Sequence, residues 1–274
     1  MRPMRLEAPA KLNVSLRVVG RRDDGYHLLD SELVLLHLAD RLLLMPGGSG
    51  LRVEGALGED VPLDEHNLAW RGLLAGFGGD PEFACLTLDK RIPAAAGLGG
   101  GSSDAAAAWR LARAAKGAER LAGEAEIRKL ATIGADVPFF AAGVAAGRVG
   151  GIGERVEPMV AESRPVVLLH PPFGLSTAAV FAELRPDEWG TADNDLAAPA
   201  RRLRPELDAL LAAMGRAGGT PRLTGSGPTI YALADDDRHA ARIAASLERA
   251  GHRTTVTRTR RAPAQIEDID EEDP

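Results

Sequence analysis

A cluster of glycines between a strand-like run and an alanine-rich segment constrains this chain more than any other feature. It lies in residues 91–108, which read RIPAAAGLGGGSSDAAAA. A strand is predicted over residues 86–92 and a helix over residues 103–115. Glycine lets the backbone approach a ligand closely and adopt positive φ, and a helix N-terminus offers unpaired N–H groups with a partial positive charge. The segment therefore predicts a phosphate-binding loop.

The alternative is a plain strand-to-helix turn with a serine N-cap. It explains one glycine and one serine, but not Gly97, Gly99, Gly100 and Gly101 together, because each additional glycine costs backbone entropy. The segment is not a P-loop, since no Gly-Lys-Ser/Thr follows, and Ser102 stands where a dinucleotide fingerprint has its third glycine. A nucleotide di- or triphosphate is the ligand that we expect.

Composition narrows the class of protein. The 274 residues suffice for one large or two ordinary domains, and 45% of them are hydrophobic, which indicates a globular chain. A net charge of −6 and 4% aromatic residues argue against a nucleic-acid partner. No apolar run approaches the length of a membrane span, and a single cysteine, Cys85, excludes a disulfide framework. We expect a cytoplasmic protein with a small-molecule ligand; composition does not indicate its oligomeric state.

The order of predicted elements divides the chain near residue 160. Beyond that point the pattern is β-α-β-β-α-β, which is ferredoxin-like, if a short helix over residues 176–184 is set aside. We expect an N-terminal domain over residues 1–160, a C-terminal domain over residues 161–266 and a frayed acidic tail over residues 267–274. Residues 186–204 are expected to be a loop. In the N-terminal domain, strands are predicted within or over residues 6–19, 28–36, 41–45, 51–53, 86–92 and 144–149, and helices over residues 67–77, 103–115 and 124–133.

Two short segments near the N-terminus carry polar groups in suggestive places. Strand alternation puts Lys11 and Asn13 on one face, although a lysine on a solvated strand face is the common case. Tyr26 and His27 follow an Asp-Asp-Gly hairpin turn signal. An aromatic face beside a hydrogen-bonding ring suits a planar heterocycle, whereas a hairpin aromatic packed on the sheet is the more common interpretation.

Two later segments are equally open. Asp136 precedes Val137-Pro138 and is predicted to be a helix N-cap. A carboxylate at a helix start also serves as a catalytic base when it faces a cleft and reaches an acceptor hydroxyl. Residues 224–228, Thr-Gly-Ser-Gly-Pro, form either a tight hairpin or a backbone approach to a bound phosphate. The sequence favours neither interpretation of that segment.

Taken together, these segments resemble the superfamily of galactokinase, homoserine kinase, mevalonate kinase and phosphomevalonate kinase, the GHMP kinases. Its phosphate loop reads Pro-x-x-x-Gly-Leu-Gly-Ser-Ser, which residues 93–103 match with two additional glycines. That expanded form is similar to one branch, the 4-diphosphocytidyl-2-C-methyl-D-erythritol kinases. The resemblance spans nearly the whole chain, because further blocks agree in order at residues 9–13, 24–27, 67–68, 134–139 and 224–227.

The resemblance implies an α+β, two-domain GHMP kinase fold, with an N-terminal ribosomal-protein-S5-domain-2-like α/β domain that binds ATP and a C-terminal ferredoxin-like domain. It also implies transfer of the ATP γ-phosphoryl group to the 2-hydroxyl of 4-(cytidine 5'-diphospho)-2-C-methyl-D-erythritol, a step of the non-mevalonate isoprenoid route. ATP and Mg²⁺ are the implied cofactors, and Ser102 and Ser103 are the candidate Mg²⁺ ligands. The implied partner is a small molecule that carries a cytidine diphosphate.

The resemblance also implies roles for single residues. Lys11 and Asp136 match the catalytic pair, and Asn13, Tyr26, His27 and Phe181 match residues that bind the cytidine substrate. The implied ATP-binding residues are Asn67, Pro93, Ala94, Ala95, Ala96, Gly97, Leu98, Gly99, Gly100, Gly101, Ser102 and Ser103. Lys11 beside Asp136 is expected to keep that carboxylate ionised and to stabilise charge on the transferred group.

One position departs from the family pattern. Asp104 stands where many members have Asn or Ala, and a carboxylate beside a phosphate loop is unfavourable unless it points to solvent, caps the helix or meets Mg²⁺. Three alternatives compete with the implied activity. They are a kinase acting on mevalonate or homoserine, a non-catalytic ATP-binding protein and a ferredoxin-like RNA-binding module. The pair Tyr26-His27 argues against the first, Lys11 with Asp136 against the second, and the acidic balance against the third.

Overall fold

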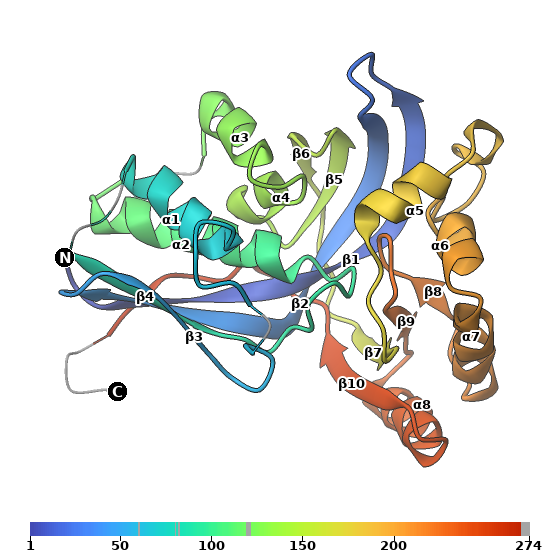
Figure 1. The fold of residues 1–274 in the computed structure, drawn as a ribbon. Coiled ribbons are helices and arrows are strands. Elements are labelled where there is room, and N and C mark those ends of the chain that lie inside the picture. The colour runs from blue at the N-terminus through green and yellow to red at the C-terminus, as the bar shows by residue number, and fades with distance from the viewer. Residues whose placement is uncertain (60, 80, 82, 119–121, 270–274) are drawn as a thin grey trace.

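Two β-sheets, each covered by helices, make up the protein in its computed structural model, which describes residues 1–59, 61–79, 81, 83–118 and 122–269 (Figure 1). The first sheet runs in the order β11-β1-β2-β4-β3, and β5 and β6 extend it from β2. Only β3 and β4 pair in parallel among its described strands. Its strands are β1 (Met4–Arg21), β2 (His27–Pro46), β3 (Gly50–Glu54), β4 (Ala84–Asp89), β5 (Ala146–Gly151), β6 (Arg155–Pro158) and β11 (Glu267–Asp268).

The first two strands are longer than predicted. β1 runs without interruption through Pro9, and the two runs expected over residues 28–36 and 41–45 form the single strand β2. Because proline has no N–H to give to the ladder, β1 shifts register between Pro9 and Lys11, and it shifts again between Asn13 and Ser15. These irregularities free backbone groups of β1 for partners outside the sheet.

The helices α1 (Leu68–Phe77), α2 (Gly100–Ala115), α3 (Glu124–Ala131) and α4 (Val137–Ala141) lie on one face of the first sheet (Figure 1). α2 packs against β1 and β2. Its buried face is built mainly from alanines 105–108, whose small side chains let the helix lie close to its neighbours. This packing fixes the start of α2, and with it the glycine cluster, above the centre of the sheet.

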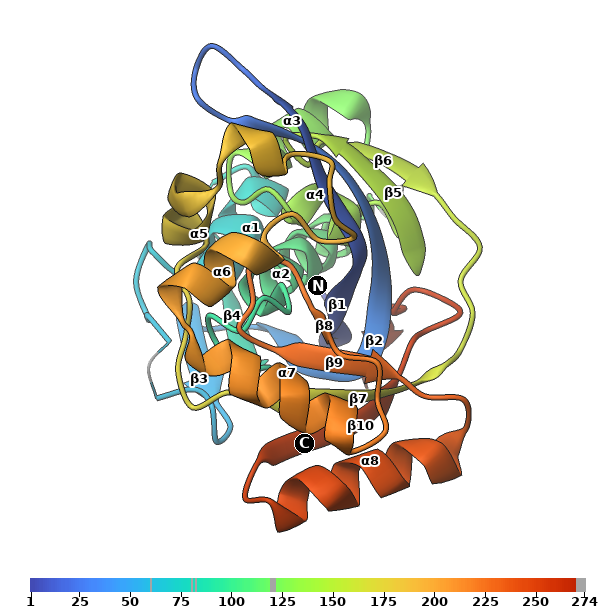
Figure 2. The ribbon, with the colours of Figure 1, turned by 90° about the vertical axis from the view of Figure 1, so that its right-hand side faces the viewer.

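The second sheet has the order β10-β7-β9-β8, with every pairing antiparallel (Figure 2). Together with its helices it gives the β-α-β-β-α-β arrangement that was predicted. Its strands are β7 (Pro165–His170), β8 (Arg222–Leu223), β9 (Ile230–Leu233) and β10 (Arg253–Arg258). Its helices are α5 (Thr177–Glu183), α6 (Ala197–Leu203), α7 (Glu206–Arg216) and α8 (Asp237–Arg249).

The prediction of a loop over residues 186–204 is wrong. This stretch contains the short 3₁₀ helix η1 (Pro186–Glu188) and α6. The start of α6 carries no polar cap, since Leu196 occupies the N-cap position, and Pro199 lies in its first turn, where proline is tolerated. Burial of Leu196 and Ala200 in the second core stabilises a helix that has no local start signal.

An apolar cluster joins the two sheets. It buries residues from β1, β2, the glycine loop and the second sheet against one another: Ala10, Leu12, Leu36, Ile92, Ala96, Leu98, Val166, Leu168 and Tyr231. Burial of this apolar surface favours association of the two sheets. The glycine loop is therefore packed between the two sheets rather than carried on the surface.

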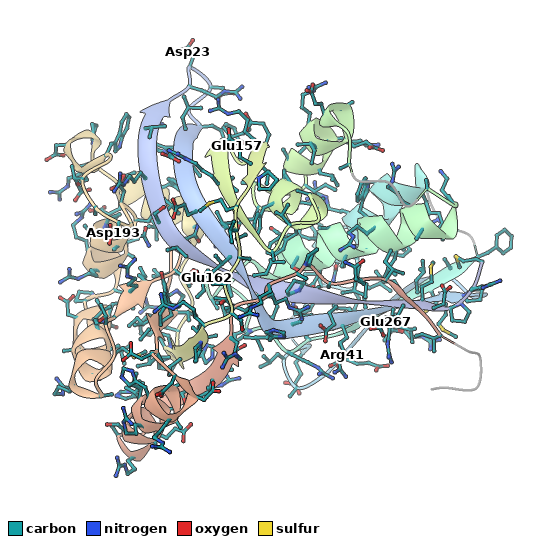
Figure 3. The ribbon with its side chains drawn as sticks, turned by 180° about the vertical axis from the view of Figure 1, so that it is seen from behind. Asp23, Arg41, Glu157, Glu162, Asp193 and Glu267 are labelled. Carbon is teal, nitrogen blue, oxygen red and sulfur yellow. The ribbon has the colours of Figure 1, made fainter. Side chains whose placement is uncertain are left out.

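The end of the chain returns to the first sheet after β10. The Arg260 amide donates to the Leu35 carbonyl at 2.8 Å, and β11 pairs with Met4 and Arg5. The expectation of a frayed tail is thus wrong for Glu267, whose carboxylate accepts from Arg5 Nε at 2.6 Å (Figure 3). Residues 270–274 lie outside the described residues. None of the helices in the described ranges is long and apolar enough to cross a membrane.

Candidate active site

A cavity of about 520 Å³ lies where the glycine loop, β1, the start of α4 and the second sheet meet. Segments that are far apart in the sequence line it. They include Lys11, Asn13, Asn67, residues 93–102, Asp104, Asp136, Phe181, Gly225 and Ser226. Most of the residues expected at the site are therefore brought to one place.

The glycine loop leads directly into α2. The helix begins at Gly100, three residues before the predicted start, and Gly99 is its N-cap with φ of 72°. The serines are thus not N-caps but lie in the first turn, where Ser103 donates its amide to the Gly99 carbonyl at 2.9 Å. The N–H groups of the first helical residues have no carbonyl four positions earlier in the helix to pair with. They give this end of the cavity a partial positive charge suited to an anion.

A second glycine-containing loop, residues 224–228, packs against the first. It joins β8 to β9, which pair antiparallel, so the hairpin interpretation is confirmed. The two backbones touch: a Cβ on Gly97 would stand 2.5 Å from the Thr224 carbonyl oxygen, and one on Gly225 would stand 3.1 Å from Lys11 Nζ. Only glycine fits at either position without displacing the neighbour. Gly225 and Ser226 also line the cavity, so a role for this loop beside a phosphate stays a prediction.

Lys11 is buried at the centre of the cavity wall, with 4% of its side chain exposed. Its ammonium donates to Asn13 Oδ1 at 2.5 Å and to the Gly97 carbonyl at 2.9 Å, and lies 3.6 Å from Asp136 Oδ2. Its own amide, free of the β1–β2 ladder at the register shift, donates to the Leu98 carbonyl at 2.9 Å. The shared face predicted for Lys11 and Asn13 is present, and both ends of Lys11 are held by the glycine loop or its neighbours.

Asp136 occupies the N-cap position of α4, as predicted, but it does not cap the helix with its side chain. The carboxylate is 37% exposed and faces the cavity beside Lys11. Because it is not committed to the helix, it is free to accept a proton or a hydrogen bond from a ligand. A carboxylate and an ammonium beside a helix start form an arrangement that suits phosphoryl transfer.

The backbone of Asn13 is held by the second half of the chain. Its amide donates to Thr224 Oγ1 at 3.1 Å, and its carbonyl accepts from the Tyr231 hydroxyl at 3.0 Å. The Asn13 side-chain amide donates to Ser31 Oγ at 2.9 Å. Four neighbours thus fix this residue, because the Lys11 ammonium also donates to it. Sequence analysis did not identify Thr224 Oγ1 or Tyr231 as partners of this strand.

The far end of the cavity is aromatic. Phe181 on α5 lines it, and His27 at the start of β2 stacks on Phe181 with ring centroids 5.1 Å apart and an interplanar angle of 22°. Trp189 meets His27 edge-on at 5.7 Å and was not identified from the sequence. Burial, and secondarily the Arg21 charge, lower the pKa of His27. Tyr26 is 62% exposed, and neither Tyr26 nor His27 is among the described residues that line this cavity; His27 reaches it only through its contact with Phe181.

Asp195 organises the segment that carries Trp189. It is buried, and its Oδ2 accepts from the Val18 amide at 2.7 Å and the Gly190 amide at 2.6 Å. Its Oδ1 accepts from the Ala192 amide at 3.1 Å. One carboxylate therefore ties residues 190–192 to β1, next to the aromatic end of the cavity.

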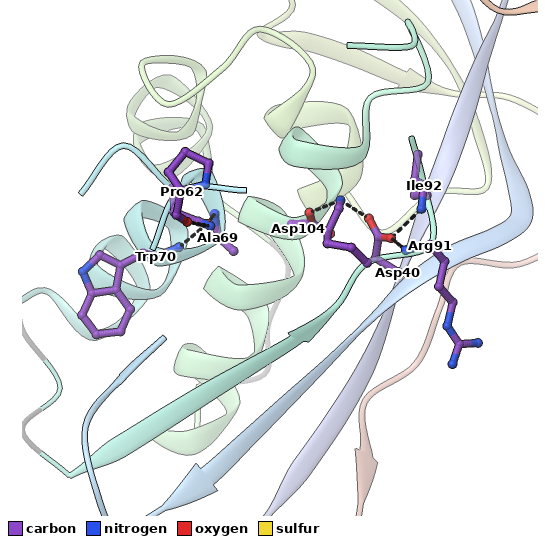
Figure 4. A network of polar contacts seen from close by, with 9 residues as sticks. Asp40, Pro62, Ala69, Trp70, Arg91, Ile92 and Asp104 are labelled. Carbon is purple, nitrogen blue, oxygen red and sulfur yellow. Dashed lines mark hydrogen bonds and ion pairs between the residues drawn. The ribbon is translucent and has the colours of Figure 1, made fainter. Parts of the chain in front are cut away.

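Asn67 is the N-cap of α1, so its polar atoms serve the fold. Its Oδ1 accepts from the amides of Ala69 and Trp70 at 2.9 and 3.3 Å, and its Nδ2 donates to the Pro62 carbonyl at 2.7 Å (Figure 4). The residue also lines the cavity. The direct contact with ATP that the resemblance implies stays a prediction.

Asp104 neither points to solvent nor caps α2, and a contact with Mg²⁺ stays a prediction. It is buried, and its Oδ2 pairs at 2.8 Å with Lys90 Nζ, which also pairs at 2.5 Å with Asp40 Oδ2 (Figure 4). Burial, with the Asp40 charge, raises the pKa of Asp104, although Lys90 acts against this shift. Burial favours a low pKa for Lys90, but the two carboxylates outweigh it and raise the pKa. Sequence analysis did not identify Asp40 or Lys90, because single charged residues at strand ends usually face solvent.

The donor set of the site bears on metal binding. Across the described residues there is no group of three or more His, Cys, Asp or Glu side chains arranged to hold a metal ion. Mg²⁺ in kinases is commonly bound through one or two protein oxygens together with substrate phosphates, and does not need such a cage. Of the two serines considered, Ser102 lines the cavity. Ser103, which is also part of α2, is buried and does not line the cavity.

Comparison with known proteins identifies the family. Residues 67–144 match the GHMP kinases N terminal domain and residues 178–253 match the GHMP kinases C terminal domain, which together cover more than half of the chain. A 4-diphosphocytidyl-2-C-methyl-D-erythritol kinase of Dinoroseobacter shibae is 38% identical, over 90% of this chain and 91% of that protein. The 4-diphosphocytidyl-2-C-methyl-D-erythritol kinase of Thermus thermophilus is 37% identical, over 88% of this chain and 91% of that protein.

Solved structures agree. A crystal structure of 4-(cytidine 5'-diphospho)-2C-methyl-D-erythritol kinase superposes with a TM-score of 0.76 at 35% identity, covering 93% of this chain and 98% of that one. The mevalonate kinase of Methanococcus jannaschii shares the fold, with a TM-score of 0.64 at 12% identity over 93% and 98% of the two chains. By its identity to the curated relatives over most of its length, this chain belongs to the 4-diphosphocytidyl-2-C-methyl-D-erythritol kinase family, small-molecule kinases of the GHMP superfamily.

Proposed function

We propose that this protein transfers the γ-phosphoryl group of ATP to the 2-hydroxyl of 4-(cytidine 5'-diphospho)-2-C-methyl-D-erythritol, a step in making isoprenoid precursors by the non-mevalonate route. One observation carries the proposal. Lys11 Nζ and Asp136 Oδ2, 3.6 Å apart, face a single cavity that is lined by the N-terminus of α2 and by Phe181, on which His27 stacks. The names of the relatives agree with this substrate.

Asp136 is the proposed general base. A base must reach the proton that it removes, and this carboxylate is exposed to the cavity and not used for capping. As the acceptor oxygen bonds to the γ-phosphorus, the bond from that phosphorus to the bridging oxygen of ADP breaks. The hydroxyl proton passes to Asp136.

Lys11 is the proposed electrostatic partner. Held by Asn13 and the Gly97 carbonyl, it directs a positive charge at the region between Asp136 and the glycine loop. A fixed charge that needs no reorganisation during the reaction stabilises the transferred phosphoryl group. Its neighbour Asn13 is proposed to line the same part of the substrate site.

The glycine loop, residues 93–103, is the proposed triphosphate site. The unpaired N–H groups at the start of α2, whose residues Gly100 and Gly101 line the cavity, suit phosphate oxygens. A Cβ on Gly99 would stand 3.0 Å from Lys11 Cγ, so glycine here lets the loop pack closely on Lys11. When bound, Mg²⁺ would supply charge neutralisation between the phosphates, with Ser102 as the residue that fits it. Asn67, beside this loop, is proposed to border the nucleoside.

His27, Phe181 and Tyr26 are the proposed cytosine site. Because its pKa is lowered, the His27 ring is neutral at pH 7, and a neutral imidazole has one nitrogen that donates and one that accepts. Cytosine presents a donor at its amino group beside ring acceptors. Phe181 offers an aromatic face to the base.

A cytoplasmic location is also proposed, consistent with the buried free thiol of Cys85.

The test is ADP release from Mg-ATP with 4-diphosphocytidyl-2-C-methyl-D-erythritol, set beside mevalonate and homoserine. Release with only the cytidine compound supports the proposal. Release with mevalonate or homoserine instead would keep the chemistry but remove the cytosine site. ATP binding without release in any mixture would indicate a non-catalytic ATP-binding protein and contradict the roles of Lys11 and Asp136.

A further inference from the structure

The glycine loop is held at both ends by one buried ion network. The loop leaves β4 at Asp89 and enters α2 at Gly100. Lys90 stands at the first end, and Asp104 stands in the helix that follows the second. Lys90 Nζ donates to Asp104 Oδ2 at 2.8 Å, so a side chain bridges the two ends of the loop (Figure 4).

Asp40 completes the network from β2. Its Oδ2 accepts from Lys90 Nζ at 2.5 Å, and its Oδ1 accepts from the amides of Arg91 and Ile92 at 2.6 and 2.8 Å (Figure 4). Backbone as well as side chain is therefore anchored where the loop begins. The central strand of the sheet, the first residues of the loop and the following helix are joined through Lys90.

Apolar side chains at these three positions would stabilise the fold at least as well as the charged groups that are present. Two carboxyl groups share one ammonium, and all three are buried beside a site that we propose for a triphosphate. Burial raises the pKa of Asp104, so its charged form is disfavoured there. Desolvating such groups costs more than packing apolar ones, so a buried ion network is weak evidence for a gain in stability. It does impose directional contacts, which apolar side chains do not.

Asp104 has a further feature that points to the cavity. Its Oδ1 is buried and accepts no hydrogen bond in the described part of the protein, while the residue lines the cavity together with Lys90. An unpaired buried oxygen is costly and is retained where the other oxygen is needed. Here the other oxygen is the one that binds Lys90.

We propose that Asp104 is a positioning residue that, through Lys90 and Asp40, holds the two ends of the glycine loop together and keeps the loop in the geometry that binds the nucleotide. The proposal rests on the function proposed above for the loop. Asp104 acts through Lys90 and the backbone rather than on the reacting atoms. Loops ordered before the ligand arrives bind it more tightly, because less conformational entropy is lost on binding.

The first experiment is calorimetric titration of Mg-ATP into the protein with no alcohol present, so that substrate identity does not enter. Asp104→Ala should weaken binding about tenfold, the value of one lost hydrogen bond between charged groups. Asp104→Asn should stay within about threefold of the wild type, because an amide oxygen still accepts from Lys90. Equal binding by the wild type and Asp104→Ala would overturn the proposal, as would Asn and Ala variants that are equally weak.

The second experiment measures amide hydrogen exchange of residues 94–103 in the ligand-free protein. Asp104→Ala should exchange faster there, and Asp104→Asn at nearly the wild-type rate. Leu247→Ala, which removes a buried side chain of α8 in the second core, is the control for lost stability alone. If Leu247→Ala, at a similar loss of Tm, speeds exchange in this loop as much as Asp104→Ala does, the role of Asp104 is only structural.

The two experiments separate the proposals from each other. A protein that binds no Mg-ATP would contradict the proposed function of the loop. The exchange measurement would still report whether Asp104 orders residues 94–103. Faster exchange in Asp104→Ala without an effect on binding would refute the link to the nucleotide.

Discussion

The two ends of the cavity are each organised by a buried aspartate, but in different ways. At the glycine loop, Asp40 holds two amides and the ammonium of Lys90, which in turn holds Asp104. At the aromatic end, Asp195 holds three amides, of Val18, Gly190 and Ala192, and no charged partner of it is described. The first end is built on the first sheet and on α2, with the glycine loop packed between both sheets. The second is built on a hairpin and a connecting segment.

We infer from this difference that the two ends of the cavity serve different ligands. A phosphate chain is common to substrates of all ATP-dependent kinases, and its proposed site here is fixed by ions and by the packing of α2. The alcohol differs between kinases of this fold, and its proposed site lies on connections, which change in sequence without disturbing the cores. Loss of one organising carboxylate should therefore affect one ligand and not the other.

The largest effect should come from Asp136, which lies between the two ends. Asp136→Asn should lower kcat about 10³-fold, the typical worth of a general base, while the Kd of Mg-ATP stays within about twofold. Single-turnover kinetics and calorimetry measure the two quantities. Asp208→Asn, an exposed carboxylate of α7 paired with Arg201, is the matched control and should leave both unchanged. Near-normal turnover in Asp136→Asn would refute the assignment of the base.

Asp195→Ala should disturb the aromatic end alone. Three amides lose a shared acceptor, so unfolding should become easier by about 3 kcal/mol, and KM for the cytidine substrate should rise about tenfold. Binding of Mg-ATP should not change. Asp195→Asn retains one acceptor oxygen and should show about half the loss in stability. Thermal denaturation measures the stability, and steady-state kinetics measure KM. An equal loss of affinity for Mg-ATP and for the cytidine substrate would show that the two ends of the cavity are not organised separately.

The two proposed aromatic contacts to the base, Phe181 and Tyr26, should differ in how much they lower KM. Phe181→Ala should raise KM for the cytidine substrate about tenfold, because base stacking on an aromatic ring contributes about 1–3 kcal/mol. Tyr26→Ala should raise it about threefold, since this ring is 62% exposed in the ligand-free protein and must be ordered on binding. KM for ATP should move less in both variants. A larger effect at Tyr26 than at Phe181 would reverse the ranking.

The smallest effect should be a pH dependence confined to the aromatic end. The pKa of His27 is lowered, so its ring stays neutral down to a pH below its ordinary value of about 6.5 and gains a proton only in more acid solution. A protonated ring no longer accepts a hydrogen bond, and KM for the cytidine substrate should therefore rise as the pH falls through that range. His27→Gln should remove the trend. A trend that survives in His27→Gln would assign it to another group.

How far the sequence predicted this structure differs between local and distant features. The glycine loop, the shared face of Lys11 and Asn13 and the hairpin before Tyr26 depend on neighbours in the chain, and they were predicted. The ferredoxin-like order of the second half also followed from local periodicity. The start of α2 was predicted three residues late, because serines are common N-caps and Gly99 in the left-handed conformation was not anticipated.

Features that depend on distant partners were not predicted. Lys90 follows the end of β4, and Asp40 lies within β2 at a position that the sequence placed between two predicted strands. Neither position indicates the buried partner that the fold brings to it. Trp189 and α6 lie in a stretch whose proline and missing caps are typical of a loop, and they gain order from the second core. No pattern within the stretch indicates the buried surface that it meets.

The hydrogen bonds that Thr224 and Tyr231 make with the Asn13 backbone bear on how the protein folds as it is synthesised. Asn13 leaves the ribosome more than two hundred residues before the groups that fix its backbone. Until then the amide and carbonyl of Asn13 lack these two partners, however well the first sheet has formed. The proposed site should thus be complete only after residues 224–231 have been made, and an N-terminal fragment that ends before them would lack these two contacts with β1.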